Sequence, residues 1–139
     1  IELIVGLQAT SPLREAADID RAIDDYHEQG CDSLLSVAVL DDFLVWQPDE
    51  ETGFASVNYD YRNRGRRQDR KAQYHENGSI YVFTPKILRR YDNRLGGRIG
   101  VTAMPMWKSF QVDEPGDLDL CETMIRRFMP DQIQKVAAS

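Results

Sequence analysis

A basic segment is the first feature of this sequence that could do chemistry. The chain of 139 residues carries a formal net charge of −6, yet six basic side chains lie within residues 59–71. Arginines mixed with tyrosine and asparagine suit the binding of carboxylates, phosphates and sugar hydroxyls, because a guanidinium group offers paired donors. A solvated loop is the competing interpretation, and a generic charged run favours it because exposed charges contribute little to stability. The place of the segment beside a strand, where α/β proteins bind ligands, favours a binding role.

Asp113 is the second candidate for chemistry. It follows residues 110–112, which are predicted to form a strand. A carboxylate at the end of a strand can bind Mg²⁺, which prefers one or two carboxylates completed by substrate phosphates. Asp113 is equally suited to cap the helix that follows, and spacing alone leaves both roles open. The acidic neighbours are expected to be helix-start charges, namely Glu114, Asp117 and Asp119.

The apolar pattern predicts an α/β scaffold that positions these residues. Residues 1–7 form a short, branched apolar run that is typical of a buried strand. Pro12 is expected to begin a helix and Gly30 to end it, and residues 33–39 form a second strand. A strand, a helix and a strand joined by short turns imply a right-handed parallel crossover. The polar turn after the first strand is therefore expected at a ligand-binding edge of the sheet.

The remaining chain divides into a core and an excursion from it. Residues 41–77 combine turn residues with the basic segment, and predict strand-like hairpins and a mobile loop. The core is expected to comprise residues 1–40 and 78–130, and residues 131–139 to form a loose tail. Further core elements are predicted after the excursion: a strand at 78–83, a helix at 85–91, strands at 99–104 and 110–112, and a closing helix at 115–129.

Composition narrows the class of protein. Hydrophobic residues make up 42% of the chain and charged residues 29%, which indicates a globular protein. No apolar run approaches the roughly 20 residues needed to span a bilayer, and the negative net charge argues against broad nucleic-acid binding. Cys31 and Cys121 fit no metal-ligand spacing, so we expect two buried free thiols. No secretory signal is visible, and we expect a cytoplasmic protein.

Three segments together resemble one family, the acylneuraminate cytidylyltransferases or CMP-sialic acid synthetases. Residues 7–14 read LQATSPLR, similar to the LQPTSPLR of the family with Ala9 in place of proline. Arg67-Gln68 is followed at a matching distance by NGSIY at residues 77–81, similar to RQ and NG[AS]IY. Residues 112–118 read VDEPGDL, similar to [IV]DxPxDL. Each motif alone is weak, but the three stand in order at the right separations and cover nearly the whole chain.

The resemblance implies a fold and a reaction. The fold is a Rossmann-like α/β nucleotidyltransferase, a three-layer sandwich, with a dimerisation excursion. The anomeric hydroxyl of a nine-carbon 2-keto acid sugar attacks the α-phosphate of CTP, and CMP-sugar and pyrophosphate leave, with Mg²⁺ aiding. The implied partners are CTP, the acidic sugar and a second copy in a homodimer. The excursion would reach toward the active site of the partner subunit, so that Arg67 serves a neighbouring subunit.

The resemblance also implies roles for individual residues. Gln8 would hydrogen-bond the sugar near its carboxylate or anomeric centre, and Asn77 and Tyr81 would line the sugar pocket. Arg67 would face acidic groups of the sugar or nucleotide, and Asp113 would hold Mg²⁺; these two are the expected catalytic residues. The full set of expected substrate-binding residues is Gln8, Thr10, Ser11, Arg14, Arg67, Gln68, Asn77 and Tyr81.

Two departures from the family pattern bear on function. Gln111 stands where the family often has the first aspartate of Asp-x-Asp, which points to a subgroup using another acidic sugar, such as legionaminic, pseudaminic or deaminated sialic acid. The basic, glycine-rich CTP-binding loop of the family would precede residue 1. We therefore interpret the chain as a sugar-binding and dimerisation portion truncated at its amino terminus, and expect it to be inactive alone.

Two other functions stay open. One is a related sugar nucleotidyltransferase that uses the eight-carbon acid KDO or a phosphorylated hexose, although the pattern from Arg67 to Tyr81 counts against it. The other is a non-catalytic binding or dimerisation module, which the absent loop and Gln111 support.

Overall fold

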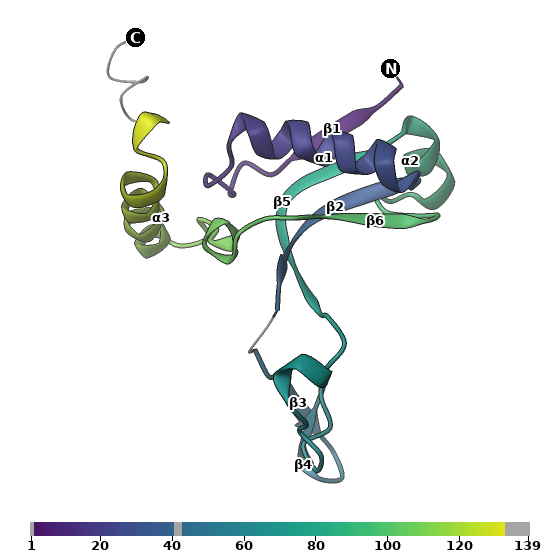
Figure 1. The fold of residues 1–139 in the computed structure, drawn as a ribbon, viewed down its shortest axis with the longest axis vertical. Coiled ribbons are helices and arrows are strands. Elements are labelled where there is room, and N and C mark those ends of the chain that lie inside the picture. Colours follow the sequence, from purple (N-terminus) through teal and green to yellow (C-terminus); the bar gives the residue numbers. More distant parts are fainter. Residues whose placement is uncertain (1, 41–42, 133–139) are drawn as a thin grey trace. The chain divides into compact units, whose positions relative to one another are not determined.

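The computed structural model describes residues 2–40 and 43–132, apart from the side chain of Arg67 (Figure 1). Two compact units are present. The larger unit comprises the chain up to Ala38 and from His75 onward, and the smaller unit is Val39–Tyr74. The predicted excursion spans 41–77, and its role in dimerisation stays a prediction. No helix in the described ranges is long and apolar enough to cross a membrane.

A four-stranded mixed sheet forms the centre of the larger unit (Figure 1). Its strands stand in the order β1 (Ile4–Leu7), β5 (Tyr74–Phe83), β2 (Ser33–Val39) and β6 (Ile99–Ala103). β1 runs antiparallel to β5, with Ile4 opposite Phe83 and Leu7 opposite Ile80. β2 runs parallel to β6, with Ser33 opposite Ile99. The sheet and its helices confirm the predicted α/β class.

The edges of the sheet differ from the sequence-based prediction. β2 has the predicted bounds, but β1 begins at Ile4 and is partly buried rather than buried, because it lies at the edge of the described sheet. The strand–helix–strand succession does not place β1 beside β2, because β5 lies between them. β5 itself begins at Tyr74, four residues before the predicted start.

Capping residues set the ends of the helices. α1 (Ala16–Gln29) begins after Glu15 and not at the predicted Pro12, because the side chains of Glu15 and Asp18 form a capping box. Gly30 ends this helix as predicted, with a φ of 55°. α2 (Pro85–Tyr91) has the predicted bounds, and α3 (Pro115–Phe128) ends one residue before the predicted Met129.

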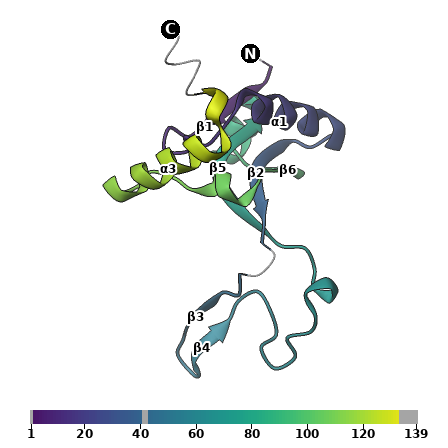
Figure 2. The same cartoon turned by 60° about the vertical axis from the view of Figure 1, so that its left-hand side comes forward.

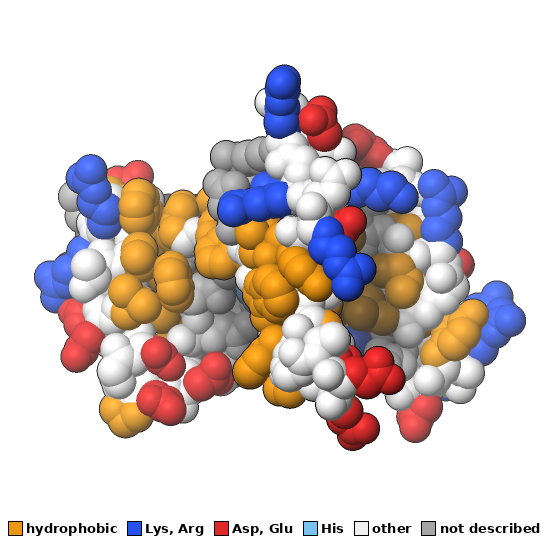
Figure 3. All heavy atoms as spheres, turned by 90° about the horizontal axis from the view of Figure 1, so that it is seen from below, with side chains coloured by type: hydrophobic (Ala, Val, Ile, Leu, Met, Phe, Trp, Pro, Cys, Tyr) orange, Lys and Arg blue, Asp and Glu red, His pale blue; other side chains and the backbone are white. Residues whose placement is uncertain are grey.

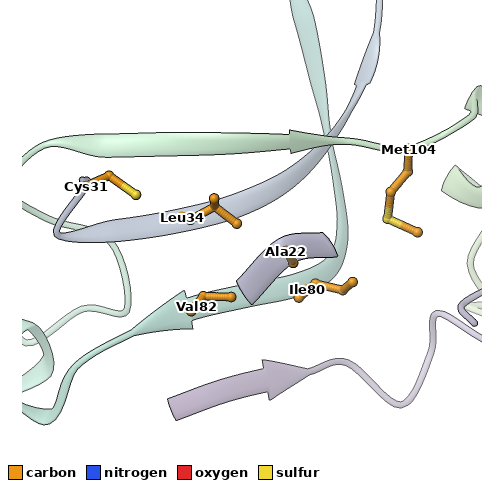
Figure 4. Packing of buried hydrophobic residues seen from close by; sticks show 6 residues of the cluster. All are labelled: Ala22, Cys31, Leu34, Ile80, Val82 and Met104. Atoms are coloured by element: carbon orange, nitrogen blue, oxygen red, sulfur yellow. The ribbon is translucent and has the colours of Figure 1, made fainter. Parts of the chain in front are cut away.

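Side chains on the two faces of the sheet form two apolar clusters. Leu34 of β2 packs with Ala22 of α1, and the neighbouring Leu35 packs with Ile87 of α2. Because successive residues of a strand point to opposite faces, the helices α1 and α2 cover opposite faces. Figure 4 shows the first cluster, which consists of Ala22, Cys31, Leu34, Ile80, Val82 and Met104. Cys31 and Cys121 are both buried free thiols, as predicted.

The predicted strand at residues 110–112 is wrong. The short 3-10 helix η2 (Met106–Ser109) precedes an extended segment that pairs with no strand in the described part of the chain. One backbone bond, from Val112 N to Thr10 O at 2.8 Å, joins this segment to the turn after β1. A single bond to a turn does not build a ladder, so the segment stays outside the sheet.

The closing helix exposes much of its predicted apolar face. Cys121 is buried and Met124 and Ile125 are partly buried, whereas Leu118 and Phe128 are 59% and 48% exposed. In Figure 3 hydrophobic side chains gather over this helix on the left. The stacking of Phe128 on Trp107, with ring centroids 4.8 Å apart, joins α3 to η2.

The smaller unit is built around one antiparallel hairpin of β3 (Trp46–Asp49) and β4 (Gly53–Ser56) (Figure 2). A short 3-10 helix, η1 (Arg67–Asp69), lies in the basic segment. Trp46 contacts the rings of Tyr59 and Tyr61, at centroid distances of 5.9 and 5.4 Å. None of the described residues of this unit is buried.

Candidate functional site

The turn after β1 is fastened to β5 by Arg14. Its Nη1 donates to the carbonyl oxygen of Ser79 at 2.9 Å and to the hydroxyl of Ser79 at 3.2 Å. Burial lowers the pKa of this guanidinium, and the nearby Asp18 carboxylate opposes the shift. The bonds fix the path of residues 8–14, and they therefore set where the Gln8 side chain lies.

Gly78 provides the space in which two amide side chains meet. Its φ is 68°, and a Cβ there would lie 2.4 Å from Gln8 Oε1 and 2.8 Å from Gln111 Nε2. Gln111 Nε2 donates to the carbonyl oxygen of Asn77 at 2.9 Å, and Thr10 Oγ1 lies 3.5 Å from Gln111 Oε1. Segments far apart in the sequence thus bring Gln8 and Gln111 together over one glycine, with Thr10 beside Gln111. We refer to these three side chains as the amide cluster.

Asn77 is fully buried and holds the two central strands together. Its Oδ1 accepts a 2.6 Å bond from Ser36 Oγ, and its Nδ2 lies 3.5 Å from the sulfur of Met104. Ser36 Oγ in turn accepts from Ile80 N at 2.8 Å. The structure therefore shows a role for Asn77 in joining β2 to β5, and its contact with a substrate stays a prediction.

Ser11 lies in the same turn but faces inward. It is 1% exposed, and its hydroxyl finds no hydrogen-bond partner among the described residues. Its expected contact with a substrate stays a prediction.

Tyr81 lies between two charged side chains. Its ring is buried, its hydroxyl donates to Glu76 Oε1, and the guanidinium carbon of Arg94 lies 3.5 Å from its ring centroid. Burial and the Glu76 carboxylate raise the pKa of Tyr81 to about 12, with Arg94 opposing the shift. The phenol is therefore a proton donor at neutral pH and not a base.

Asp113 is exposed and lies one residue before the cap of α3. Glu114 occupies the N-cap position, and Asp117 Oδ2 accepts from the backbone nitrogens of Asp113 and Glu114 at 3.0 and 2.9 Å. Asp113 is therefore not the helix cap, which corrects that alternative, whereas Glu114 and Asp117 are helix-start charges as expected. These backbone bonds hold the pKa of Asp117 below its ordinary value.

The chemistry of the donor set limits how a metal could bind. In residues 2–40 and 43–132, no group of three His, Cys, Asp or Glu side chains could hold a metal ion. The exposed carboxylate of Asp113 accepts no hydrogen bond from the described residues. It fits a Mg²⁺ ion that takes its other ligands from substrate phosphates and water, which is how this ion commonly binds.

Arg67 and Gln68 belong to the smaller unit. Gln68 is exposed, and the side chain of Arg67 lies outside the described part of the chain. Their expected roles stay predictions.

Known cytidylyltransferases are similar to this chain in sequence. N-acylneuraminate cytidylyltransferase B of Danio rerio is 33% identical over 131 residues, which cover 92% of this chain. The N-acylneuraminate cytidylyltransferase of Oncorhynchus mykiss is 30% identical over the same share. The chain is a homologue of part of these cytidylyltransferases. It spans 30% of the length of both relatives. The resemblance seen in the sequence is thereby confirmed.

A more distant relative carries a different name. Post-translational flagellin modification protein B of Campylobacter coli is 26% identical over 125 residues, which cover 90% of this chain and 53% of that protein. No protein-family model matches the chain.

The sequence motifs shared with the cytidylyltransferases missed two residues of the site. Glu76 and Arg94 flank Tyr81 in space but lie outside the three motifs. Glu76 directly precedes the second motif, which is a signal for its proximity. Arg94 follows Tyr81 by 13 residues and a whole helix, so no local pattern pairs them.

Proposed function

We propose that this chain forms the sugar-binding part of a cytidylyltransferase that activates an acidic nine-carbon sugar, either sialic acid or a relative such as legionaminic or pseudaminic acid. One observation carries the proposal: three segments shared in order with the cytidylyltransferases meet over Gly78. Gln8 from the first and Gln111 beside the third converge on the second. The names of the homologues support the same reaction. The helices on both faces of the sheet support a Rossmann-like three-layer fold.

The residues of the chain would bind and orient the sugar. In the reaction, the anomeric hydroxyl loses its proton to solvent and its oxygen bonds to the α-phosphorus of CTP. The bond from that phosphorus to the bridging oxygen breaks, and pyrophosphate leaves. The Gln8 amide nitrogen would donate to the sugar beside its anomeric centre. The amide oxygen lies over Gly78. Asp113 would hold Mg²⁺, which when bound stabilises negative charge on the phosphates.

We also propose a homodimer in which the smaller unit lies at the interface. Its hairpin has four residues in each strand, and none of the described residues of the unit is buried. Phe54 is 63% exposed, Phe43 58% and Val57 53%. An isolated hairpin is at best marginally stable in water, so a second surface that covers these side chains would stabilise it. In this dimer Arg67 would serve the active site of the partner subunit. We place the protein in the cytoplasm, where CTP is available.

The test is release of pyrophosphate by the complete protein with CTP and Mg²⁺, with and without a panel of acidic sugars. Release that depends on a nine-carbon acidic sugar is the expected result. Release with KDO, or with UTP or GTP and a sugar phosphate, would instead identify a related nucleotidyltransferase. Sugar binding without turnover would identify a non-catalytic module.

A further inference from the structure

Arg94, Tyr81 and Glu76 form a second polar group close to the amide cluster. We propose that Arg94 and Glu76, held at the face and the hydroxyl of Tyr81, form a charge-selective subsite. Arg94 binds the carboxylate of the acidic sugar, and Glu76 accepts a hydrogen bond from a neighbouring hydroxyl. The inference rests on the proposed function, and it names residues that set substrate specificity.

The strand register connects the subsite to the amide cluster. Tyr81 pairs with Gly6 across the ladder of β1 and β5, and Gln8 follows Gly6 by two residues. Gln8 lies one residue beyond the end of β1. Continuing the alternation of the strand by that one residue puts Gln8 on the same side of the sheet as Tyr81. Diagonal neighbours in an antiparallel ladder are about 7–8 Å apart, a span that one sugar can bridge.

Arg94 contacts the Tyr81 ring, which leaves its N–H groups to bind a ligand. Its guanidinium carbon lies over the Tyr81 ring at 3.5 Å from the centroid, and the side chain is half-buried. In the described ranges no carboxylate pairs with Arg94. A guanidinium stacked on a ring keeps its N–H groups directed outward along its edges, where they match the two oxygens of a carboxylate.

Glu76 fixes the ring on which Arg94 rests. Glu76 and Tyr81 are five positions apart, and an odd number of positions would place them on opposite faces of a regular strand. The left-handed conformation of Gly78, between them, offsets this alternation and lets the Tyr81 hydroxyl reach Glu76 Oε1. Glu76 is exposed, so its other oxygen is available to accept from a sugar hydroxyl.

The balance of charges identifies the class of ligand. One cation and one anion side by side favour a ligand with a single carboxylate next to hydroxyl groups. A triphosphate carries several negative charges, and the Glu76 carboxylate would repel it. The chemistry therefore assigns this subsite to the acidic sugar and not to the nucleotide.

The test compares two probes by calorimetry on the full chain, N-acetylneuraminic acid and its methyl ester. Arg94→Met is expected to weaken binding of the acid by about tenfold or more and to leave the ester unchanged, because a hydrogen-bonded charge pair is lost. Arg94→Lys keeps the charge without the planar fork, so it should recover part of that loss. The matched control is Arg90→Met, because the Arg90 guanidinium also lies over a tyrosine ring, that of Tyr91 at 5.3 Å.

The outcomes separate this inference from the proposed function. Loss of acid binding in Arg94→Met, with wild-type binding in Arg90→Met, supports the subsite. Acid binding that Gln8→Ala weakens and Arg94→Met leaves unchanged overturns the subsite alone. No binding of either probe by the wild-type chain overturns the proposed function as well. Thermal unfolding of each variant shows that a loss of affinity is not a loss of folding.

Discussion

Replacement of Gly78 by alanine tests the geometry of the amide cluster. The backbone there has a φ of 68°, and an added Cβ would meet Gln8 Oε1 at 2.4 Å and Gln111 Nε2 at 2.8 Å. Alanine in the left-handed region costs about 1–2 kcal/mol. Both contacting atoms are the ends of flexible side chains, so they can move away at little further cost in stability. Moving them, however, takes the Gln8 amide out of the place from which it would bind the sugar.

The expected result is therefore a modest loss of stability and a large loss of binding. Urea unfolding should show Gly78→Ala to be less stable by about 1–2 kcal/mol. Calorimetry with N-acetylneuraminic acid should show binding weakened by about tenfold, the value of one or two hydrogen bonds.

Gly30 supplies a matched control for this prediction. Its φ is 55°, it caps α1, and no atom of the described residues beyond its chain neighbours lies within 4 Å of where its Cβ would be. Gly30→Ala should lose similar stability and keep wild-type affinity. Wild-type affinity in a folded Gly78→Ala would refute the assignment of the amide cluster to the sugar. Unchanged stability would refute the argument from backbone conformation.

Three further predictions concern other parts of the larger unit. Lys108→Met should destabilise the fold by about 3 kcal/mol in urea, because it leaves the buried Asp18, 2.5 Å from the Lys108 ammonium, without that partner. The raised pKa of Tyr81 means that the folded state holds this proton more tightly than the unfolded state. The free energy of unfolding of the wild type should therefore fall as the pH rises from the ordinary tyrosine pKa of 10.0 to about 12. Tyr81→Phe should lack this pH-dependent part of the stability. Asp113→Asn should lower Mg²⁺-dependent turnover of the complete protein by about a hundredfold without changing stability, whereas Asp119→Asn, also exposed, should change neither.

Each of these has a contrary outcome. A change below about 1 kcal/mol in Lys108→Met would show that Asp18 is adequately paired without the lysine. Equal alkaline profiles of the wild type and Tyr81→Phe would contradict the environment described for the phenol. Full turnover in Asp113→Asn would remove this carboxylate from the metal site.

The elements that the sequence predicts best are those with signals inside the element itself. β2 is a mostly apolar run, α2 begins at Thr84-Pro85, and Gly30 ends α1. The start of α1 was misplaced because Pro12 and Glu15 are both acceptable beginnings, and only the capping box of Glu15 decides between them. Residues 110–112 have a strand-like composition, but the structure offers them no strand to pair with.

The features that could not be predicted depend on contacts between distant residues. The insertion of β5 between β1 and β2 is a matter of pairing, which the local pattern does not contain. The ion pairs of Lys108 with Glu15 and Asp18, at 2.6 and 2.5 Å, join residues about ninety positions apart. Lysine is rarely buried unless it is paired, so without the distant partners the sequence around Lys108 indicates an exposed side chain.

The candidate site also combines residues that the sequence motifs predict with contacts that only the structure shows. The family motifs identify Gln8 and Thr10, and the structure brings Gln8 to Gly78 and Thr10 to Gln111. Gln111 was noted as a departure from the family pattern, and its bond to the Asn77 carbonyl explains what an amide does there that a carboxylate cannot: it donates.

Sugar-dependent release of pyrophosphate from CTP tests the central claim most directly. The complete protein is assayed with CTP and Mg²⁺, alone and with sialic acid, legionaminic acid, pseudaminic acid and KDO in turn. The account predicts release with a nine-carbon acidic sugar and none without sugar. Silence with every nine-carbon acid, from a protein shown to be folded, would contradict it.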